Sequence, residues 1–388
     1  MNNHICFVNT LPRAYQYFLK PQMEALRARG FQITFISCDD PEFISRFPPC
    51  YHYRIVPMRR GADILRTPFL IWSFYRIFRR ERFGLVQYSG PNAAFYASIA
   101  AALARIPVRI YGQWGIRYVG FQGVARWLFK KVERIICACS TVVEPDSASN
   151  LAFAVQAGLY PYEKGRVIWN GSACGVDLSR FDISGREVWR KEKRAALGIP
   201  GDAIVLGFVG ALRRDKGTNE LIQAFRTLSG DRQDLWLLLV GDVELYHTVE
   251  KELRDWAERW PRVVYHAPTS DVPAMLAAMD LFVFPSYREG FGSVVIEAAA
   301  MGVPAVVSDI PGPVDAVTPE VTGLVVPVRC GSCLSDKIAE LLADEGRLQR
   351  MSAAAIRHVR DHFEQGELMR QFCDDKQRLM DLKRKDAV

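Results

Sequence analysis

The strongest constraint on the fold is an alternation of short apolar runs with helical stretches. In the N-terminal half, a strand-like run at residues 5–8 precedes a helical segment at 15–29 and a second strand-like run at 31–37, which together form a β-α-β unit. This alternation predicts a mostly parallel sheet with helices on both faces. Further strands are expected at residues 53–56, 85–88, 108–111 and 135–138, and a further helix at 93–104.

The alternation restarts after a connecting segment that contains Asn170-Gly171-Ser172 and the charged stretch 186–194. A chain of 388 residues is long enough to bury two separate cores. The sequence therefore predicts an α/β protein with two Rossmann-like, doubly wound parallel-sheet domains, residues 1–175 and 176–365, facing each other across a ligand-binding cleft. Strands are expected at 204–209, 235–240, 263–266, 281–284, 305–307 and 324–326, and helices at 217–228, 244–260, 272–278, 293–301 and 335–343.

The last segment, residues 366–388, stands apart from both domains. Residues 364–385 have a polar, helical pattern, and a helix of that length could reach back from the second domain to the first. A solvated terminal helix is the other interpretation, and the pattern alone does not decide between the two.

Three features of the sequence bear on where in the cell the protein works: its N-terminus, its apolar runs and its cysteines. The N-terminus has no basic region followed by an apolar one, so no signal peptide is expected. The longest apolar runs fall well short of the roughly 20 residues of a membrane span. Nine cysteines without framework spacing favour reduced thiols, and Cys330 and Cys333 are expected to be free. We expect a cytoplasmic protein, with peripheral association at the inner face of the plasma membrane left open.

Positive charge is concentrated in the N-terminal half. Residues 1–175 hold 22 Lys and Arg against 10 Asp and Glu, a net charge of +12, whereas the rest of the chain has a net charge of −5. This asymmetry favours an anionic partner for the first domain, either a phospholipid surface, a lipid-phosphate acceptor or nucleic acid. Nucleic acid is the weakest of these, because no recognition motif accompanies the charge. A solvated basic face is the remaining interpretation.

Residues 284–298 form the segment richest in chemical information. A strand ends at Phe284 and a helix begins near Ser293, so the free backbone N–H groups of the helix start make an anion site suited to a diphosphate. Gly290 and Gly292 let the backbone approach a ligand without a Cβ in the way.

Two glutamates flank this helix start. Glu289 lies in the loop before it, and Glu297 lies about one turn inside it. A carboxylate accepts hydrogen bonds and repels phosphate, so both are expected to bind sugar hydroxyls on either side of the diphosphate.

The spacing of Glu289 and Glu297, with Gly-Phe-Gly between them, resembles the E-x7-E motif of retaining GT-B glycosyltransferases, the large family called group 1 or family 4. The match extends to Ala-Met-Gly-Val-Pro at 300–304 and Ser-Asp-Ile-Pro-Gly at 308–312, as in bacterial transferases that assemble capsule, lipopolysaccharide or other glycans. The resemblance implies that Glu297 binds the ribose of the donor nucleotide and that Glu289 positions the transferred sugar. By the same resemblance, the donor site also includes Gly290, Phe291 and Gly292.

A second segment, Gly-Phe-Val-Gly-Ala-Leu-Arg-Arg-Asp-Lys-Gly at 207–217, resembles the phosphate-binding loop of the family. The resemblance implies that Lys216 and an arginine contact the donor diphosphate. The arginine that usually follows the glycine is Ala211 here, so Arg213 or Arg214 is expected to compensate. Solvated loop charges are the alternative interpretation of these residues.

The resemblance also implies a mechanism, in which the acceptor attacks the face of the sugar that the diphosphate leaves. Lys216, a nearby arginine and the helix start would then neutralise the leaving group, while the donor phosphate takes the acceptor proton. Double displacement would need a carboxylate on the opposite face of the sugar, and it stays open. No Asp-x-Asp motif occurs in a loop suited to a metal, so no metal and no cofactor are expected.

The predicted reaction moves a sugar from a nucleotide-sugar, with UDP as the expected nucleotide, to a hydroxyl of a glycan or lipid-linked acceptor in cell-surface polysaccharide biosynthesis. Arg13 in the first β-to-α loop, and Trp114 and Arg117 after the strand at 108–111, are candidate acceptor-binding residues. Gln113 is a further candidate for the sugar site.

The stretch 67–80 mixes aromatic residues with a basic end, and arginines at 59, 60, 66 and 82 flank it. This composition is typical of an interfacial helix on anionic lipid. A core helix with basic ends explains it as well.

Two other functions are compatible with this architecture. One is a nucleotide-sugar epimerase that binds the same donor without transferring the sugar. The other is a non-catalytic, membrane-associated relic of the fold, although an intact Lys216, Glu289 and Glu297 count against it.

Overall fold

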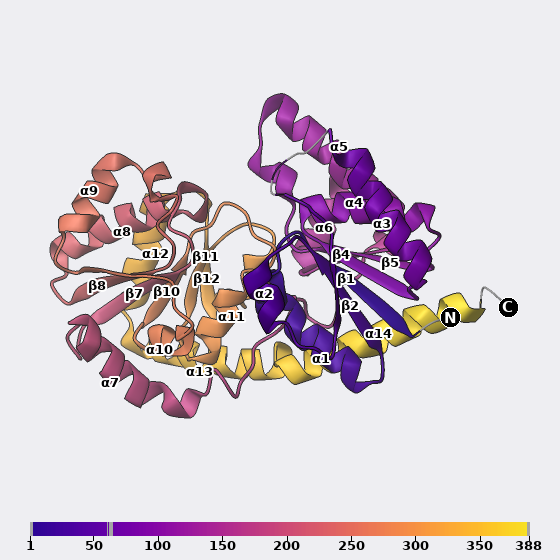
Figure 1. The fold of residues 1–388 in the computed structure, drawn as a ribbon. Helices are drawn as coiled ribbons and strands as arrows, with labels where there is room; N and C mark the ends of the chain where they lie inside the picture. Colours follow the sequence, from indigo (N-terminus) through magenta and orange to yellow (C-terminus); the bar gives the residue numbers. More distant parts are fainter. Residues whose placement is uncertain (1–2, 60, 62–64, 386–388) are drawn as a thin grey trace. The chain divides into compact units, whose positions relative to one another are not determined.

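The computed structural model describes residues 3–59, 61 and 65–385, so Arg60 lies outside the described residues. The chain divides into two compact units (Figure 1). The first unit comprises Met1–Cys174 and Gly366–Val388, and the second comprises Gly175–Gln365. Each unit contains one six-stranded sheet. No helix in the described ranges is long and apolar enough to cross a membrane.

The sheet of the first unit has the strand order β3-β2-β1-β4-β5-β6, and neighbouring strands run parallel. This is the doubly wound order of a dinucleotide-binding fold, which confirms the predicted fold class for this half. Its strands are β1 (His4–Val8), β2 (Gln32–Ser37), β3 (His52–Ile55), β4 (Leu85–Ser89), β5 (Val108–Gln113) and β6 (Val142–Pro145).

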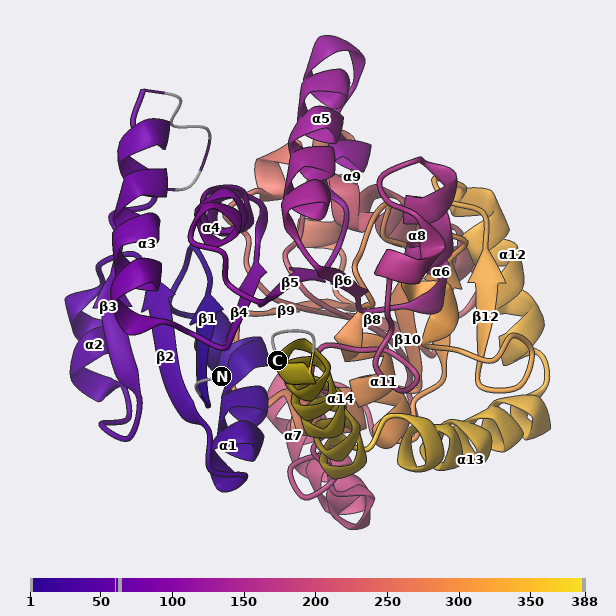
Figure 2. The ribbon, with the colours of Figure 1, turned by 90° about the vertical axis from the view of Figure 1, so that its right-hand side faces the viewer.

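The strands of this sheet point alternate side chains into two different cores, as the pleat requires. In β1, Ile5 and Phe7 belong to one buried cluster, whereas Cys6 and Val8 belong to the other. Figure 2 shows helices on both faces of the sheet. The helices are the π-helical segment Tyr15–Leu19, then α1 (Lys20–Ala28), α2 (Pro41–Arg46), α3 (Thr67–Glu81), α4 (Pro91–Leu103), α5 (Gly123–Cys139) and α6 (Ala148–Gln156).

The C-terminal helix α14 (Gln365–Lys385) packs on the first unit. Its residues Phe372, Cys373 and Met380 are buried in the same cluster as Ile5 and Phe7 of β1. The fully buried Lys376 forms an ion pair with Glu144 of β6. A solvated terminal helix does not describe this segment, because one of its faces completes a hydrophobic core.

The strand predicted at residues 135–138 is wrong. These residues form the last turn of α5, and the strand of this region is β6, a few residues later. Ile136 and Cys137 are buried while Ile135 is exposed, so the run covers one face of a helix. An apolar run of four residues does not distinguish a buried strand from the end of a helix.

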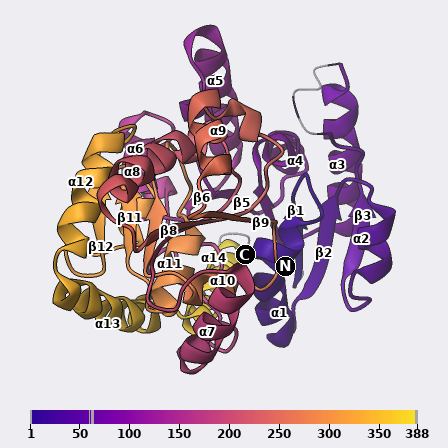
Figure 3. The same ribbon diagram turned by 90° about the vertical axis from the view of Figure 1, so that its left-hand side faces the viewer.

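The sheet of the second unit has the strand order β12-β11-β10-β7-β8-β9, again parallel throughout. Figure 3 shows this unit with α8, α9 and α12 labelled on one side of the sheet. Its strands are β7 (Ile204–Val209), β8 (Leu235–Val240), β9 (Val263–His266), β10 (Leu281–Phe284), β11 (Ala305–Ser308) and β12 (Gly323–Val326). Its helices are α7 (Arg186–Leu197), α8 (Thr218–Asp231), α9 (Lys251–Arg259), α10 (Val272–Ala277), α11 (Ser293–Ala300), α12 (Gly331–Leu342) and α13 (Glu345–His362).

Two helices of this unit start away from their predicted positions. The helix predicted at 244–260 begins only at Lys251, because a 3-10 turn at Tyr246–Thr248 precedes it. The helix predicted at 335–343 begins at Gly331, since Cys330 caps its N-terminus by accepting a hydrogen bond from the Cys333 amide. The charged stretch 186–194 belongs to α7, where the buried Arg194 pairs with Asp280 at 2.7 Å.

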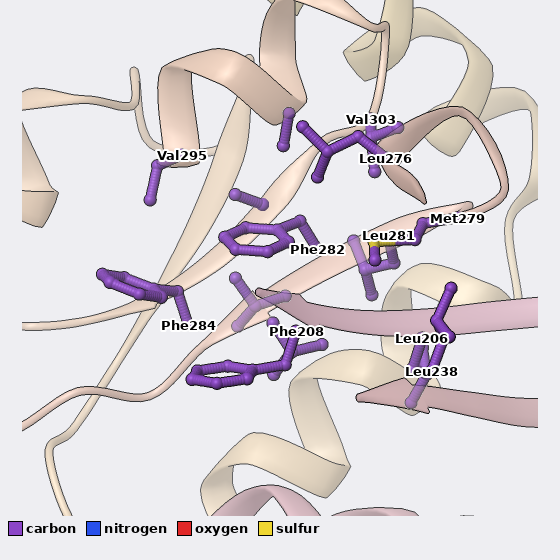
Figure 4. Packing of buried hydrophobic residues seen from close by; sticks show 14 of the residues in the cluster. Leu206, Phe208, Leu238, Leu276, Met279, Leu281, Phe282, Phe284, Val295 and Val303 are labelled. Carbon is purple, nitrogen blue, oxygen red and sulfur yellow. The ribbon is translucent and has the colours of Figure 1, made fainter. Parts of the chain in front are cut away.

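The core of the second unit fixes the carboxyl ends of its central strands (Figure 4). Phe208 of β7 and Phe284 of β10 stack with their ring centroids 6.2 Å apart. A side chain at Gly207 would overlap the sulfur of Met279, with a Cβ only 2.0 Å from it. The close packing places the loops that follow β7 and β10 next to each other.

Candidate active site

The loop between β10 and α11 ends in an uncapped helix start. Gly292 is the N-cap residue, with φ at +85°, a left-handed conformation that favours glycine. Because it has no side chain, no side-chain cap from this position bonds the first N–H groups of α11, and its carbonyl oxygen accepts a hydrogen bond from the Val295 amide, at 2.8 Å. These N–H groups and the helix dipole can therefore receive an anion.

The loop between β7 and α8 lies against the loop after β10, backbone to backbone. A Cβ at Gly217, where φ is +74°, would come within 2.0 Å of the Pro285 carbonyl oxygen. The Tyr287 amide donates a hydrogen bond of 3.0 Å to the Asp215 carbonyl oxygen. The two segments that resemble the family motifs therefore form one continuous wall of the second unit.

Lys216 and Glu289 meet in this wall. The Lys216 Nζ lies 2.5 Å from the Glu289 Oε1, and the two side chains are only 19% and 13% exposed. The buried Ser286 hydroxyl donates a second hydrogen bond of 2.7 Å to the same oxygen. Glu289 is thus held in place from two sides, and its carboxylate balances the Lys216 charge.

Arg213 is also held by a carboxylate. Its Nε lies 2.7 Å from one Asp215 oxygen, and Arg288 lies 3.0 Å from the other. Arg213 and Arg288 thus share one carboxylate between the two loops, whereas Arg214 is exposed. Arg213 and Arg288 therefore lie on the same two loops as the Lys216–Glu289 pair.

Glu297 lies inside α11 and differs from Glu289 in having no partner. Among the described residues, no side chain or backbone group forms a hydrogen bond with its carboxyl group. Burial raises the pKa of Glu297 to about 7, although the positive charge of Arg180 opposes the rise. A partly buried carboxyl group without a protein partner is suited to accept hydrogen bonds from a ligand.

The other residues predicted to bind the donor could do so only through the backbone. The Phe291 side chain is buried and packs edge-on against Phe363, with the ring centroids 5.3 Å apart. It fixes the loop, and only its main chain is available to a ligand. Gly290 and Gly292 likewise offer main-chain groups alone.

The candidate acceptor-binding residues lie in the first unit. Arg13 is exposed in the loop after β1, and Trp114 is partly buried against Phe18, with the ring centroids 5.5 Å apart. The Arg117 guanidinium lies 5.2 Å from the centroid of the Phe129 ring. Gln113 is fully buried: it donates to Glu133 at 2.6 Å and accepts from the Tyr160 hydroxyl at 2.9 Å. Its amide is occupied by the protein, which removes it as a sugar ligand.

Several residues of the site were not identified from the sequence. Ser286, Asp215 and Arg288 all belong to the quoted motif segments, but nothing in their residue types shows that they bind Glu289 and Arg213. Tyr287 is a further case, because its hydroxyl donates to Glu220 at 2.7 Å. The one sequence signal that could have indicated these contacts was the high density of polar residues in the two glycine-containing loops.

The cysteine prediction is wrong for one pair. Cys330 and Cys333 are joined by a disulfide, whereas the other seven cysteines are free. The start of α12 brings the two sulfur atoms together, since residues three apart lie on the same face of a helical turn. Across residues 3–59, 61 and 65–385, no three or more metal-ligating side chains gather into a potential metal site.

Comparison with known proteins supports the assignment of the two units. The family described as Glycosyltransferase Family 4 matches residues 22–171, and the family described as Glycosyl transferases group 1 matches residues 190–358. The capsular polysaccharide biosynthesis glycosyltransferase CapM of Staphylococcus aureus is 27% identical over 345 residues, which cover 89% of each chain. A D-inositol 3-phosphate glycosyltransferase of Corynebacterium aurimucosum is 32% identical over 48% of this chain and 45% of its own length.

A solved structure has the same fold over nearly the whole chain. HepE of Anabaena in complex with UDP-glucose superposes with a TM-score of 0.77, covering 96% of this chain and 99% of HepE at 21% identity. The likeness confirms the predicted architecture of two Rossmann-like units.

Proposed function

Because the chain belongs to the GT-B glycosyltransferases, with a family 4 region followed by a group 1 region, we propose that it transfers a sugar from a UDP-sugar to a hydroxyl group of a glycan or lipid-linked acceptor. The similarity to CapM along 89% of both chains supports a role in cell-surface polysaccharide biosynthesis. The UDP-glucose complex of HepE supports a UDP-sugar donor, since HepE shares the fold.

One observation carries this proposal: Lys216, Glu289 and the open start of α11 lie on adjoining loops of one wall, with Glu297 a turn further along the helix. In the proposed complex, the diphosphate binds at the start of α11. Lys216 turns from Glu289 to the phosphate oxygens, and Arg213 or Arg288 assists from its place beside Asp215. Glu289 then accepts hydrogen bonds from the sugar, and Glu297 accepts them from the ribose.

The proposed chemistry is electrostatic. Charge develops on the leaving diphosphate in the transition state, where Lys216 and the α11 amides stabilise it. Glu289 is already bound to Lys216 and Ser286, so we assign it to sugar positioning and not to nucleophilic attack. The acceptor enters on the face that the diphosphate leaves, which retains the anomeric configuration. No metal ion and no cofactor take part in this proposal.

The acceptor is proposed to be anionic or to be presented by an anionic lipid, because the residues 1–175 carry a net charge of +12. Arg13, Trp114 and Arg117 remain candidates for its binding. We further propose that the protein works in the cytoplasm at the inner face of the plasma membrane, where such acceptors are accessible, and that it does not bind nucleic acid.

The test is a transfer assay with UDP-, GDP- and ADP-sugars, preceded by a thermal-shift screen of the same compounds. A donor at 100 times its Kd stabilises the protein by about 2.7 kcal/mol. UDP release that requires a lipid-linked acceptor, is unchanged by EDTA, and yields a product with the donor's anomeric configuration would support the proposed donor, acceptor class, metal independence and retaining mechanism. An inverted product would refute the retaining mechanism, and loss of activity in EDTA would refute metal independence.

The two alternatives predict different results in this assay. An epimerase would convert the donor into its epimer without acceptor, so the appearance of a second UDP-sugar in its absence would favour that function. A non-catalytic relic would not depend on the site. Full complementation of a deletion strain by a Glu289→Ala variant would favour it, and loss of complementation would exclude it.

A further inference from the structure

The start of α5 exposes several apolar side chains. All residues from 122 to 128 are exposed, although Arg126 lies against Tyr118 of the preceding 3-10 turn Arg117–Gly120. Val124 is 81% exposed, Trp127 is 62% exposed and Leu128 is 50% exposed. Single exposed apolar residues are normal on protein surfaces, but three neighbours on one projecting turn mark an interaction site.

A second exposed apolar group lies at the start of α3. Leu70, Phe74 and Phe78 face the core of the unit, whereas Phe69 and Trp72 are 54% and 56% exposed on the outer side. The preceding Leu65 is almost fully exposed as well. The stretch 67–80 is therefore a helix whose inner face packs in the core and whose outer face carries the aromatic and basic residues.

The two exposed groups lie on the same side of the first unit. Helix α3 packs on α4, and α4 packs on α5, so the three form one layer. In Figures 1, 2 and 3, which are turned about one vertical axis, the starts of α3 and α5 both lie at the top of this unit. One flat surface could therefore contact both.

The charge of this region has a single sign. Residues 65–80 and 117–132 each contain four Lys or Arg and neither Asp nor Glu. Lys131 lies 5.5 Å from the ring centroid of Trp127, while Arg126 and Lys130 lie 5.4 and 5.7 Å from that of Tyr118. Lys131 thus lies beside an exposed ring, whereas the Tyr118 ring beside Arg126 and Lys130 is buried. Cations next to exposed apolar side chains suit an apolar phase whose boundary is negatively charged.

We infer that the starts of α3 and α5 form a docking surface for an anionic phospholipid bilayer, with Val124, Trp127 and Leu128 inserted among the lipids. The indole of Trp127 lies at the interface, and Arg126, Lys130 and Lys131 contact the headgroup phosphates. A protein partner fits less well, because the core of a protein interface is depleted of charged residues, whereas here the exposed Lys131 lies beside the Trp127 ring and the exposed Arg126 precedes it.

This surface deepens the proposed function by naming how the chain reaches a lipid-linked acceptor, but its evidence is independent of the donor site. Docking would hold the first unit against the layer in which such an acceptor is embedded. The residues named for the surface all belong to the first unit, whereas the donor wall belongs to the second.

The experiment uses the full chain and sedimentation with vesicles of phosphatidylcholine, alone or mixed with phosphatidylglycerol. We expect binding to the mixed vesicles that weakens as salt is raised. A Val124→Ser/Trp127→Ser variant should lose at least about tenfold in partitioning, since each buried apolar side chain contributes strongly to transfer. A Lys130→Gln/Lys131→Gln variant should bind the mixed vesicles more weakly than wild type does. Its interaction with vesicles of phosphatidylcholine alone should be unchanged.

The matched control is Val188→Ser on α7 of the second unit, because Val188 is 58% exposed and far from the surface in sequence. It should bind as the wild type does. Equal binding by wild type and the Val124→Ser/Trp127→Ser variant, or no wild-type binding to the mixed vesicles, would overturn the inference. A concentration-dependent dimer that the same variant abolishes would instead assign the surface to a second copy of the chain.

Donor binding separates this inference from the proposed function. The surface variants should keep the wild-type thermal shift with a UDP-sugar, which also shows that they fold. A protein that binds vesicles but transfers no sugar would refute the function and leave the surface standing. A protein that transfers sugar to a soluble acceptor but does not bind vesicles would support the function and refute the docking surface.

Discussion

Replacing Glu297 by glutamine should stabilise the second unit at alkaline pH while weakening donor binding. Burial raises the pKa of this carboxyl group from 4.5 to about 7. One pKa unit corresponds to about 1.4 kcal/mol, so keeping the carboxylate ionised in the folded protein costs up to about 3 kcal/mol. Glutamine has nearly the same shape and no such cost. Stability and function therefore make opposite demands on this position.

The direction of the pH effect on stability follows from proton linkage. Because the folded-state pKa is above the unfolded-state value, the stability due to protonated Glu297 is fully present below pH 4.5 and is lost as the pH rises through about 7. From about pH 5 to pH 8, wild type should lose about 2–3 kcal/mol more than Glu297→Gln. For a domain of this size, that corresponds to a difference of roughly 5–10 °C in Tm.

The assay is thermal unfolding of wild type and Glu297→Gln across this pH range, followed by donor titration. The donor should be a UDP-sugar, because free UDP ends in a phosphate that itself titrates near pH 6. Wild-type affinity should rise towards pH 7 as Glu297 ionises, whereas the variant should bind more weakly and without this pH dependence.

The control is Glu252→Gln, since the Glu252 side chain is 83% exposed and should change neither measurement. Parallel pH profiles for wild type and Glu297→Gln would refute the argument from burial. A variant that binds the donor as tightly as wild type would refute the role of Glu297 in ribose binding.

Four further outcomes are expected. Lys216→Ala should slow transfer by about 10²–10³-fold by removing a cation from the leaving group, measured as kcat with saturating donor. Gly217→Ala should destabilise the second unit by at least about 1–3 kcal/mol in urea unfolding, since the added Cβ meets the facing loop at 2.0 Å and φ is +74°. Lys376→Met should cost the first unit about 3–5 kcal/mol by leaving a buried carboxylate unpaired. Thiol titration of the denatured, unreduced protein should count seven thiols, and nine after reduction of Cys330–Cys333.

The strands of the second unit could be predicted closely because their apolar runs are continuous and end at polar residues or glycine. The bounds expected for β7, β8, β9 and β10 are those of the structure. Buried parallel strands read as unbroken apolar runs, so their length is visible in the sequence. The strand predicted at residues 135–138 was wrong for the same reason, because the buried end of α5 is also a short apolar run.

The sequence named the residues of the candidate site but could not predict the contacts between them. Lys216 and Glu289 are 73 residues apart, and each was chosen from its own motif. Their contact depends on the Gly217 backbone lying against Pro285, a packing detail that no residue type reveals. Because Lys216 is paired with Glu289, the diphosphate of the proposed donor would have to compete with Glu289 for it. Donor binding would thereby free the Glu289 oxygen at the moment when the sugar arrives, which couples the two roles through one shared ion pair.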